Sequence, residues 1–126
     1  MTIVTAAIII KNNKILIARR NTGSLSGYWE FPGGKLEEGE TVQECLAREL
    51  FEEFSVQAKV GEVFAESEYK YAHGAIKLIA LHAEIVETKL TSNAHDKVEW
   101  VDPEELLNYK LAPADVPIAE KMKETR

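Results

Sequence analysis

The first part of the chain alternates apolar runs with short polar breaks in a pattern that predicts two paired strands. Residues 3–10 are almost entirely apolar and rich in β-branched side chains, which is typical of a buried strand. Asn12 and Asn13 form a polar break that suits a tight turn, and residues 14–20 then alternate as a second strand. Residues 21–27 contain several serines and glycines, so we expect a loop there.

Apolar residues recur at helical spacing after position 41. Thr41 is followed three residues later by Glu44, the pairing of a capping box, so a helix is expected to begin at this threonine. The apolar stripe of this helix consists of Leu46, Ala47, Leu50, Phe51 and Phe54. Glutamates lie beside the stripe. The helix should therefore pack through the stripe and present carboxylates to a cleft.

The rest of the pattern predicts more strands and two short helices. Strands are expected at residues 28–31, 56–71, 75–86 and 97–101. His73 and Gly74 mark the turn between the two long strands, and Asp102 with Pro103 marks the start of a short helix. A last helix covers about residues 114–124. Strands and helices mix without a regular βαβ repeat, which favours an α/β or α+β sandwich with a mixed β-sheet.

The composition is that of one globular domain covering residues 1–126. The residues are 45% hydrophobic and 29% charged, and the chain is long enough to bury a core. The net charge of −6 argues against broad binding to nucleic acid polymers. The single cysteine, Cys45, cannot form an internal disulfide, and the apolar run at residues 3–10 is too short to span a bilayer. We therefore expect a cytoplasmic protein that does not associate with membranes.

Three glutamates of the predicted helix form a charge cluster that a folded protein would normally avoid. Glu49, Glu52 and Glu53 fall within an arc of roughly 100° on one helical face. Like charges three and four residues apart repel one another and weaken a helix. A hard divalent cation would relieve this repulsion, because Mg²⁺ prefers oxygen ligands. The cluster therefore predicts a metal site.

The spacing around this cluster resembles the signature of the Nudix hydrolases. The matching positions are Gly34, five residues, Glu40, seven residues, and then Arg48-Glu49-Leu50-Phe51-Glu52-Glu53-Phe54-Ser55-Val56, with Ser55 in place of a final glycine. The preceding segment Trp29-Glu30-Phe31-Pro32-Gly33-Gly34-Lys35 resembles the MutT-like branch. Residues 111–117 are similar to a segment of bacterial CTP pyrophosphohydrolases. Because serine adopts a left-handed conformation less readily than glycine, Ser55 is expected to alter or strain the helix end.

The resemblance implies a three-layer α/β/α sandwich and hydrolysis that depends on Mg²⁺, with Mn²⁺ as the alternative. In the MutT-like branch, a nucleoside triphosphate gives a monophosphate and pyrophosphate. The resemblance assigns Glu49, Glu52 and Glu53 as metal ligands and catalytic residues, with the Gly33 carbonyl as a further ligand. Glu40 is expected to assist them. Arg48 is expected to orient a neighbouring glutamate by bidentate pairing.

Four residues are candidates for contacts with substrate. Gly34 allows the backbone to approach the phosphates closely. Arg20 is either a phosphate contact or a surface charge at the end of a strand, and Lys35 is either near the phosphates or an ordinary surface lysine. Asp115 either reads hydrogen-bond donors of a base, such as cytosine N4 or guanine N1 and N2, or caps the last helix.

One position departs from the family pattern in a way that bears on the general base. Several MutT-like relatives have a glutamate about six residues before the tryptophan that matches Trp100, where this chain has Ala94. His95, Asp96 or Glu49 is then the candidate for the missing role. The expected enzyme is a monomer or homodimer that hydrolyses modified or oxidised nucleotides, with 8-oxo-dGTP and CTP-type nucleotides as the two substrate candidates. The alternative is a nucleotide-binding sensor that kept the fold and lost catalysis.

Overall fold

The computed structural model describes residues 1–125, and residue 126, the last position of the expected domain, lies outside this range. Two α-helices, two 3₁₀-helices and eight strands are present in the described residues. The strands are β1 (Thr2–Ile8), β2 (Ile10–Lys11), β3 (Lys14–Arg20), β4 (Trp29–Glu30), β5 (Gly33–Lys35), β6 (Lys59–Tyr71), β7 (Gly74–Glu84) and β8 (His95–Val101). The helices are α1 (Val42–Phe54), η1 (Pro103–Asn108), η2 (Pro113–Asp115) and α2 (Val116–Glu124).

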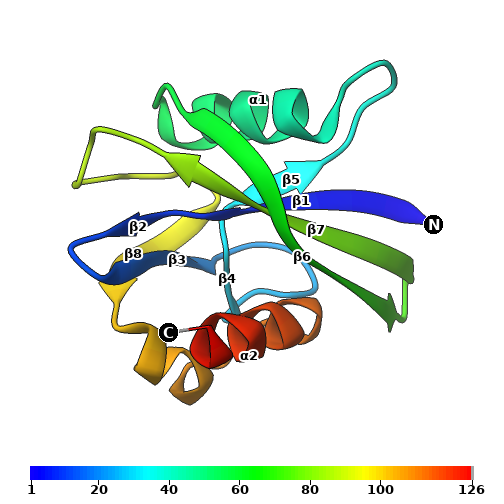
Figure 1. The fold of residues 1–126 in the computed structure, drawn as a ribbon. Helices are drawn as coiled ribbons and strands as arrows, with labels where there is room; N and C mark the ends of the chain where they lie inside the picture. The colour runs from blue at the N-terminus through cyan, green and yellow to red at the C-terminus, as the bar shows by residue number, and fades with distance from the viewer. Residues whose placement is uncertain (126) are drawn as a thin grey trace.

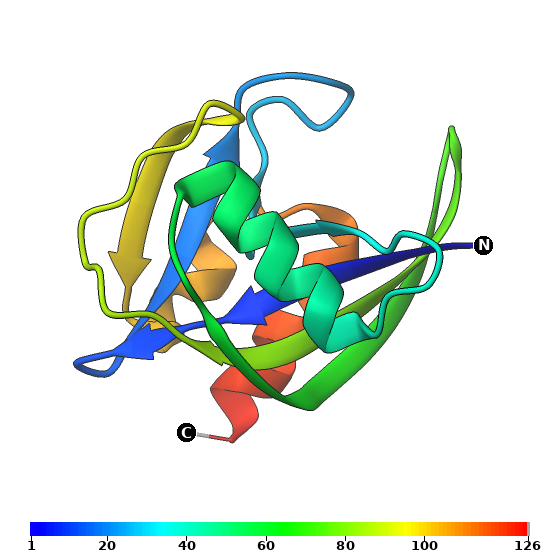
Figure 2. The ribbon, with the colours of Figure 1, turned by 90° about the horizontal axis from the view of Figure 1, so that it is seen from above.

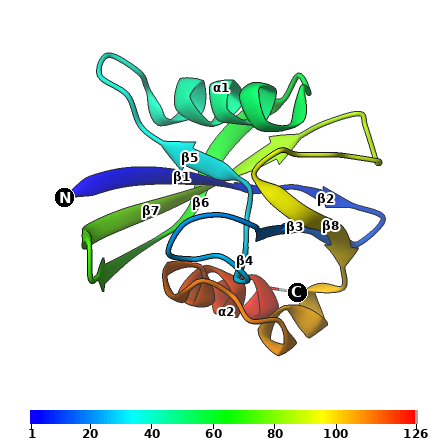
Figure 3. The same cartoon turned by 180° about the vertical axis from the view of Figure 1, so that it is seen from behind.

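The strands form two small sheets between the two α-helices. One sheet has the order β5-β1-β7-β6 and is mixed, because β1 and β7 are parallel while the other pairs are antiparallel. The other has the order β2-β3-β4, with β8 paired to β3. Helix α1 covers one side of the strands and α2 covers the other (Figures 1 and 3). Seen from above, α1 lies across both sheets (Figure 2).

Two hydrophobic clusters fill the spaces between these three layers. Ile15 and Ile17 of β3 face the cluster that contains Ile118 of α2, whereas Leu16 faces the cluster that contains Leu50 of α1. All three β3 side chains are fully buried, because successive residues of a strand point to opposite faces and both faces are covered. The expected α/β/α sandwich with a mixed sheet is therefore confirmed.

The first hairpin is confirmed, with a difference at its end. Asn12 and Asn13 both have positive φ angles, 52° and 64°, which asparagine tolerates better than most residues. The apolar run at residues 3–10 is not one buried strand. Strand β1 ends at Ile8, and Ile10 belongs to the short strand β2 and is 46% exposed. No helix among the described residues is long and apolar enough to cross a membrane.

Several predicted boundaries were wrong by a few residues. Strand β6 begins at Lys59 because Val56, expected as its first residue, is buried with the α1 side chains instead. Strand β8 begins two residues earlier than expected, at His95. The helix predicted from about residue 114 begins with the 3₁₀ turn η2, and α2 follows from Val116. The segment after Asp102 is a 3₁₀-helix, and the Asp102 side chain accepts the expected capping bond from the Glu104 amide.

Candidate active site

Helix α1 has well-defined ends that fix the position of its glutamates. The Thr41 hydroxyl accepts from the Glu44 amide at 3.1 Å, and the Glu44 carboxylate accepts from the Thr41 amide at 2.9 Å, so the expected capping box is present. At the other end, Ser55 adopts the left-handed conformation, with φ 57° and ψ 35°, and its amide donates to the Phe51 carbonyl. Ser55 thus ends the helix in the conformation that a glycine would adopt.

The helical register turns two of the three glutamates inward. Relative to Leu46, Glu53 lies only roughly 20° and Glu49 roughly 60° around the helix axis. The side chains of Glu49 and Glu53 are each 17% exposed, whereas that of Glu52 is 56% exposed. Phe51 lies roughly 140° from Leu46 and is 56% exposed, so its assignment to the buried stripe was wrong. The core-facing side of α1 therefore includes two carboxylates and excludes one phenylalanine.

Arg48 connects the glutamate cluster to the segment that precedes the helix. Its guanidinium donates twice to Glu40, from Nε at 2.6 Å and from Nη2 at 3.0 Å. Nη1 donates to Glu49 and to Glu52 at 3.1 Å each, and Nη2 also donates to the Lys35 carbonyl. Both Glu40 oxygens thus accept from Arg48, so this glutamate anchors the arginine. The same pairing lowers the pKa of Glu40 to about 2.

Glu53 is the carboxylate of the cluster whose ionised form the protein disfavours most. Its Oε1 is buried and, within residues 1–125, has no hydrogen-bond partner. Burial is the main cause that raises the pKa of Glu53 to about 7; nearby Glu30 and Glu49 also raise it, while His95 and Arg20 act in the opposite direction. A buried oxygen without a partner is costly unless a cation or a donor approaches it.

Gly33 and Gly34 are required by close packing. A Cβ atom at position 34 would overlap the Glu49 carboxylate, and one at position 33 would overlap the Thr5 backbone carbonyl. Any larger residue at position 34 would therefore displace Glu49.

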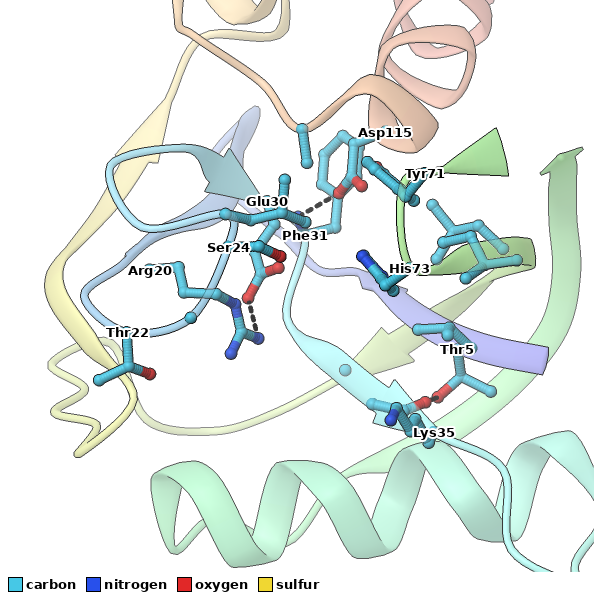
Figure 4. A pocket seen from close by; sticks show the side chains of 18 residues that line it. Thr5, Arg20, Thr22, Ser24, Glu30, Phe31, Lys35, Tyr71, His73 and Asp115 are labelled. Carbon is cyan, nitrogen blue, oxygen red and sulfur yellow. Dashed lines mark hydrogen bonds and ion pairs between the residues drawn. The ribbon is translucent and has the colours of Figure 1, made fainter. Parts of the chain in front are cut away.

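A cavity of about 310 Å³ opens on the other side of these glycines. Its lining includes the predicted substrate residues Arg20, Gly34, Lys35 and Asp115. Figure 4 shows the three labelled ones, Arg20, Lys35 and Asp115, around the cavity on different elements. Glu30, which sequence reasoning missed, also lines the cavity. The sequence offered one signal for Glu30, a charge between two large aromatic residues in a short strand.

Asp115 lies both in the wall of this cavity and at the start of α2. Asp115 occupies the N-cap position of α2, as one of the two interpretations expected, but its side chain makes no capping hydrogen bond there. Instead Oδ2 accepts from the Phe31 amide at 2.9 Å (Figure 4). Asp115 is only 5% exposed, and burial raises the pKa of its carboxyl well above the usual range.

The two residues that follow Ala94, His95 and Asp96, point to opposite sides of β8. Asp96 pairs with Arg19 through two hydrogen bonds of 2.8 and 2.9 Å, and its side chain is 45% exposed. His95 points inward, and its fully buried side chain contacts Glu30 and lies 3.9 Å from Glu53. Of the two neighbours, only His95 therefore reaches the cluster.

The residues present suit a hard divalent cation. In the part of the chain that the structure describes, no three acidic, histidine or cysteine side chains already converge as a metal site. The donors are nevertheless of the right kind: Glu49 and Glu53 are inward-facing carboxylates, Glu52 lies one turn from Glu49, and Glu53 Oε1 lacks a partner. Arg48 supplies only one positive charge to this group, so the cluster retains a surplus of negative charge.

Comparisons with known proteins agree with this geometry. The NUDIX domain family matches residues 1–122. The chain is 42% identical over 118 residues to the CTP pyrophosphohydrolase of Escherichia coli, covering 93% of this chain and 87% of the relative. It is 32% identical over 114 residues to the 8-oxo-dGTP diphosphatase of the same organism, covering 90% and 88%.

Solved structures show the same arrangement. The solution structure of the E. coli ORF135 protein superposes with a TM-score of 0.86 at 40% identity, covering 100% of this chain and 91% of the other. The crystal structure of a MutT protein from Methanosarcina mazei superposes with a TM-score of 0.89 at 23% identity, covering 98% and 94%, which shows the shared fold.

Proposed function

Since the chain belongs to the NUDIX family and is a Nudix hydrolase, we propose a specific reaction for it. We propose that the protein is a nucleoside triphosphate pyrophosphohydrolase. The reaction is hydrolysis of a nucleoside triphosphate by water to a nucleoside monophosphate and pyrophosphate. The main observation behind this proposal is the position of Gly34. This glycine lies against the Glu49 carboxylate and also lines the cavity. A nucleotide in the cavity would thus lie with its phosphates next to the glutamate cluster.

Glu49, Glu52 and Glu53, with the Gly33 carbonyl, would hold Mg²⁺ or Mn²⁺. A divalent cation bound there would neutralise charge on the phosphate oxygens and would lower the pKa of a water molecule. Arg48 holds Glu49 and Glu52 in place through one nitrogen, Nη1. Arg20 and Lys35 line the cavity and supply positive charge to the phosphates.

Glu49 is our candidate for the general base. Asp96 is paired with Arg19 on the outer side of β8, and both ring nitrogens of His95 are engaged in hydrogen bonds. The Glu49 carboxylate instead lies against Gly34, which lines the cavity. Burial also raises the pKa of Glu49 above its usual value, which favours proton acceptance.

Asp115 is our candidate for reading the base. One oxygen is fixed by the Phe31 amide, and the carboxyl group faces the cavity. An acceptor at this place suits an exocyclic amine such as cytosine N4. The similarity to the CTP pyrophosphohydrolase supports a CTP-type nucleotide as the preferred substrate, with 8-oxo-dGTP as the second candidate.

Pyrophosphate release with Mg²⁺, measured across a panel of normal and oxidised nucleotides, tests this function. Wild type should turn over at least one nucleoside triphosphate, and E52Q should abolish turnover while leaving nucleotide affinity largely unchanged. E120Q, an exposed substitution on α2, is the matched control and should behave as wild type. Absence of turnover with every nucleotide would refute the proposal.

A further inference from the structure

His95 is a polar side chain enclosed by the protein between two parts of the site. None of its side chain is exposed. Its ring stacks on Phe54 of α1, with ring centroids 5.7 Å apart and planes 12° from parallel. Its Nε2 lies 2.8 Å from Glu30 Oε2, and its Nδ1 lies 2.8 Å from the Ser92 hydroxyl. Both ring nitrogens are therefore in hydrogen bonds, and the ring cannot rotate without breaking them.

The direction of the bond to Glu30 follows from the chemistry of its partner. Glu30 also accepts from Arg20 Nη2 at 2.6 Å, on the same oxygen, Oε2. A carboxylate has only acceptors, so His95 carries a proton on Nε2 and donates it to Glu30. The Ser92 hydroxyl is itself held by the Ala94 amide at 3.1 Å. The result is a continuous chain of hydrogen bonds from Ser92 through His95 and Glu30 to Arg20.

This chain ends at the substrate cavity. Arg20 lines it, and Figure 4 shows the Arg20 guanidinium meeting the Glu30 carboxylate there. With one nitrogen fixed by Glu30, the remaining donors of the guanidinium have a defined direction. In the part of the chain that the structure describes, the Glu30 carboxylate has two hydrogen-bond partners, Arg20 and His95. Loss of His95 would leave the Glu30–Arg20 pair without its inner anchor.

We propose that His95 is a positioning residue that holds Glu30, and through it Arg20, in the orientation that contacts the phosphates of the substrate. The proposal rests on the proposed function, because it takes the ligand of Arg20 to be a nucleotide. His95 touches no substrate itself. Partners that orient metal-ligating side chains typically contribute about 10- to 100-fold to affinity or activity, and we expect an effect of the same order for His95.

The first test needs no turnover. In ¹H–¹⁵N spectra of the histidine side chains, wild type should show a proton on His95 Nε2 that exchanges slowly with water. E30Q should shift this resonance, and D96N, one residue further along β8 and facing outward, should leave it unchanged. A proton found only on Nδ1, or a resonance unaffected by E30Q, would overturn the proposal even if the protein is an active pyrophosphohydrolase.

The second test uses steady-state kinetics. H95F keeps an aromatic ring against Phe54 and removes both hydrogen bonds, so kcat/KM should fall by about 10- to 100-fold, mainly through KM. H95Q keeps an amide donor for Glu30 and should recover most of the loss. In an R20Q background, H95F should cause no further loss, because the two residues act in one chain.

Additive losses in the double variant, or equal defects in H95F and H95Q, would contradict the proposal. If H95F does not fold, judged by cooperative thermal melting, H95Q and the spectra decide. A wild type that turns over no nucleotide would refute the proposed function, while the spectra still test the hydrogen-bond chain.

Discussion

Replacing Glu53 by glutamine should stabilise the metal-free protein at neutral and alkaline pH. The pKa of Glu53 rises from 4.5 to about 7 on folding, mainly because the side chain is buried. The folded state therefore binds more protons than the unfolded state between these two values, and stability falls as pH rises through this window. The loss is absent below about pH 4.5 and complete above about pH 7.

The size of this effect follows from the two pKa values. At about 1.4 kcal/mol for each pH unit between them, the cost of ionising Glu53 in the folded protein is about 3 kcal/mol. Because 17% of the side chain remains exposed, solvent screens part of this cost, and we expect a gain of about 2 kcal/mol for E53Q at pH 8. For a domain of this size that corresponds to roughly 8 °C in Tm.

Thermal melting followed by circular dichroism in EDTA, between pH 4.5 and pH 8, measures this gain. The matched control is E52Q on the same helix, since Glu52 is 56% exposed and its removal relieves no burial. Adding Mg²⁺ should then stabilise wild type more than E53Q. A ligand that binds only the folded state raises its stability, and E53Q lacks one of the proposed Mg²⁺ ligands. A gain that stays constant down to pH 4.5, or a loss of stability at pH 8, would refute this reasoning.

Other substitutions test the packing, the helix start and the base contact. G34A should displace the Glu49 carboxylate and reduce kcat by about 100-fold, whereas G61A, whose added methyl meets only ordinary contacts, should leave kcat unchanged. T41A removes the capping bond and should lower the free energy of unfolding in urea by about 1 kcal/mol; an unchanged midpoint would contradict the role of this cap. D115N should reduce the preference for CTP over UTP, measured as a ratio of kcat/KM values, by about 1–3 kcal/mol, and an unchanged ratio would remove Asp115 from base recognition.

Local patterns predicted the fold well, because each element carries its own signal. The capping box at Thr41 and Glu44 located the start of α1, and Asn12 with Asn13 located the first turn. Phe51 was misplaced because periodicity places a residue on an arc but does not give the width of the surface that covers the helix. At roughly 140° from Leu46, Phe51 lies beyond that surface.

The candidate site was only partly predictable, because its charges depend on partners far away in sequence. The spacing of Glu49, Glu52 and Glu53 was visible, but not that two of them face inward and the third outward. The Glu30 carboxylate is held by His95, which lies 65 residues away. The two residues come together because β3 pairs with β4 on one side and with β8 on the other. No local pattern contains that contact.

The products of the reaction test the central claim most directly. ³¹P NMR of the purified protein with CTP and Mg²⁺ should show pyrophosphate and CMP rising together, with 8-oxo-dGTP giving the corresponding pair if it is a substrate. E52Q should give neither product. Release of orthophosphate with a nucleoside diphosphate, or no change in the spectrum with any nucleoside triphosphate, would contradict the assignment of this chain as a pyrophosphohydrolase.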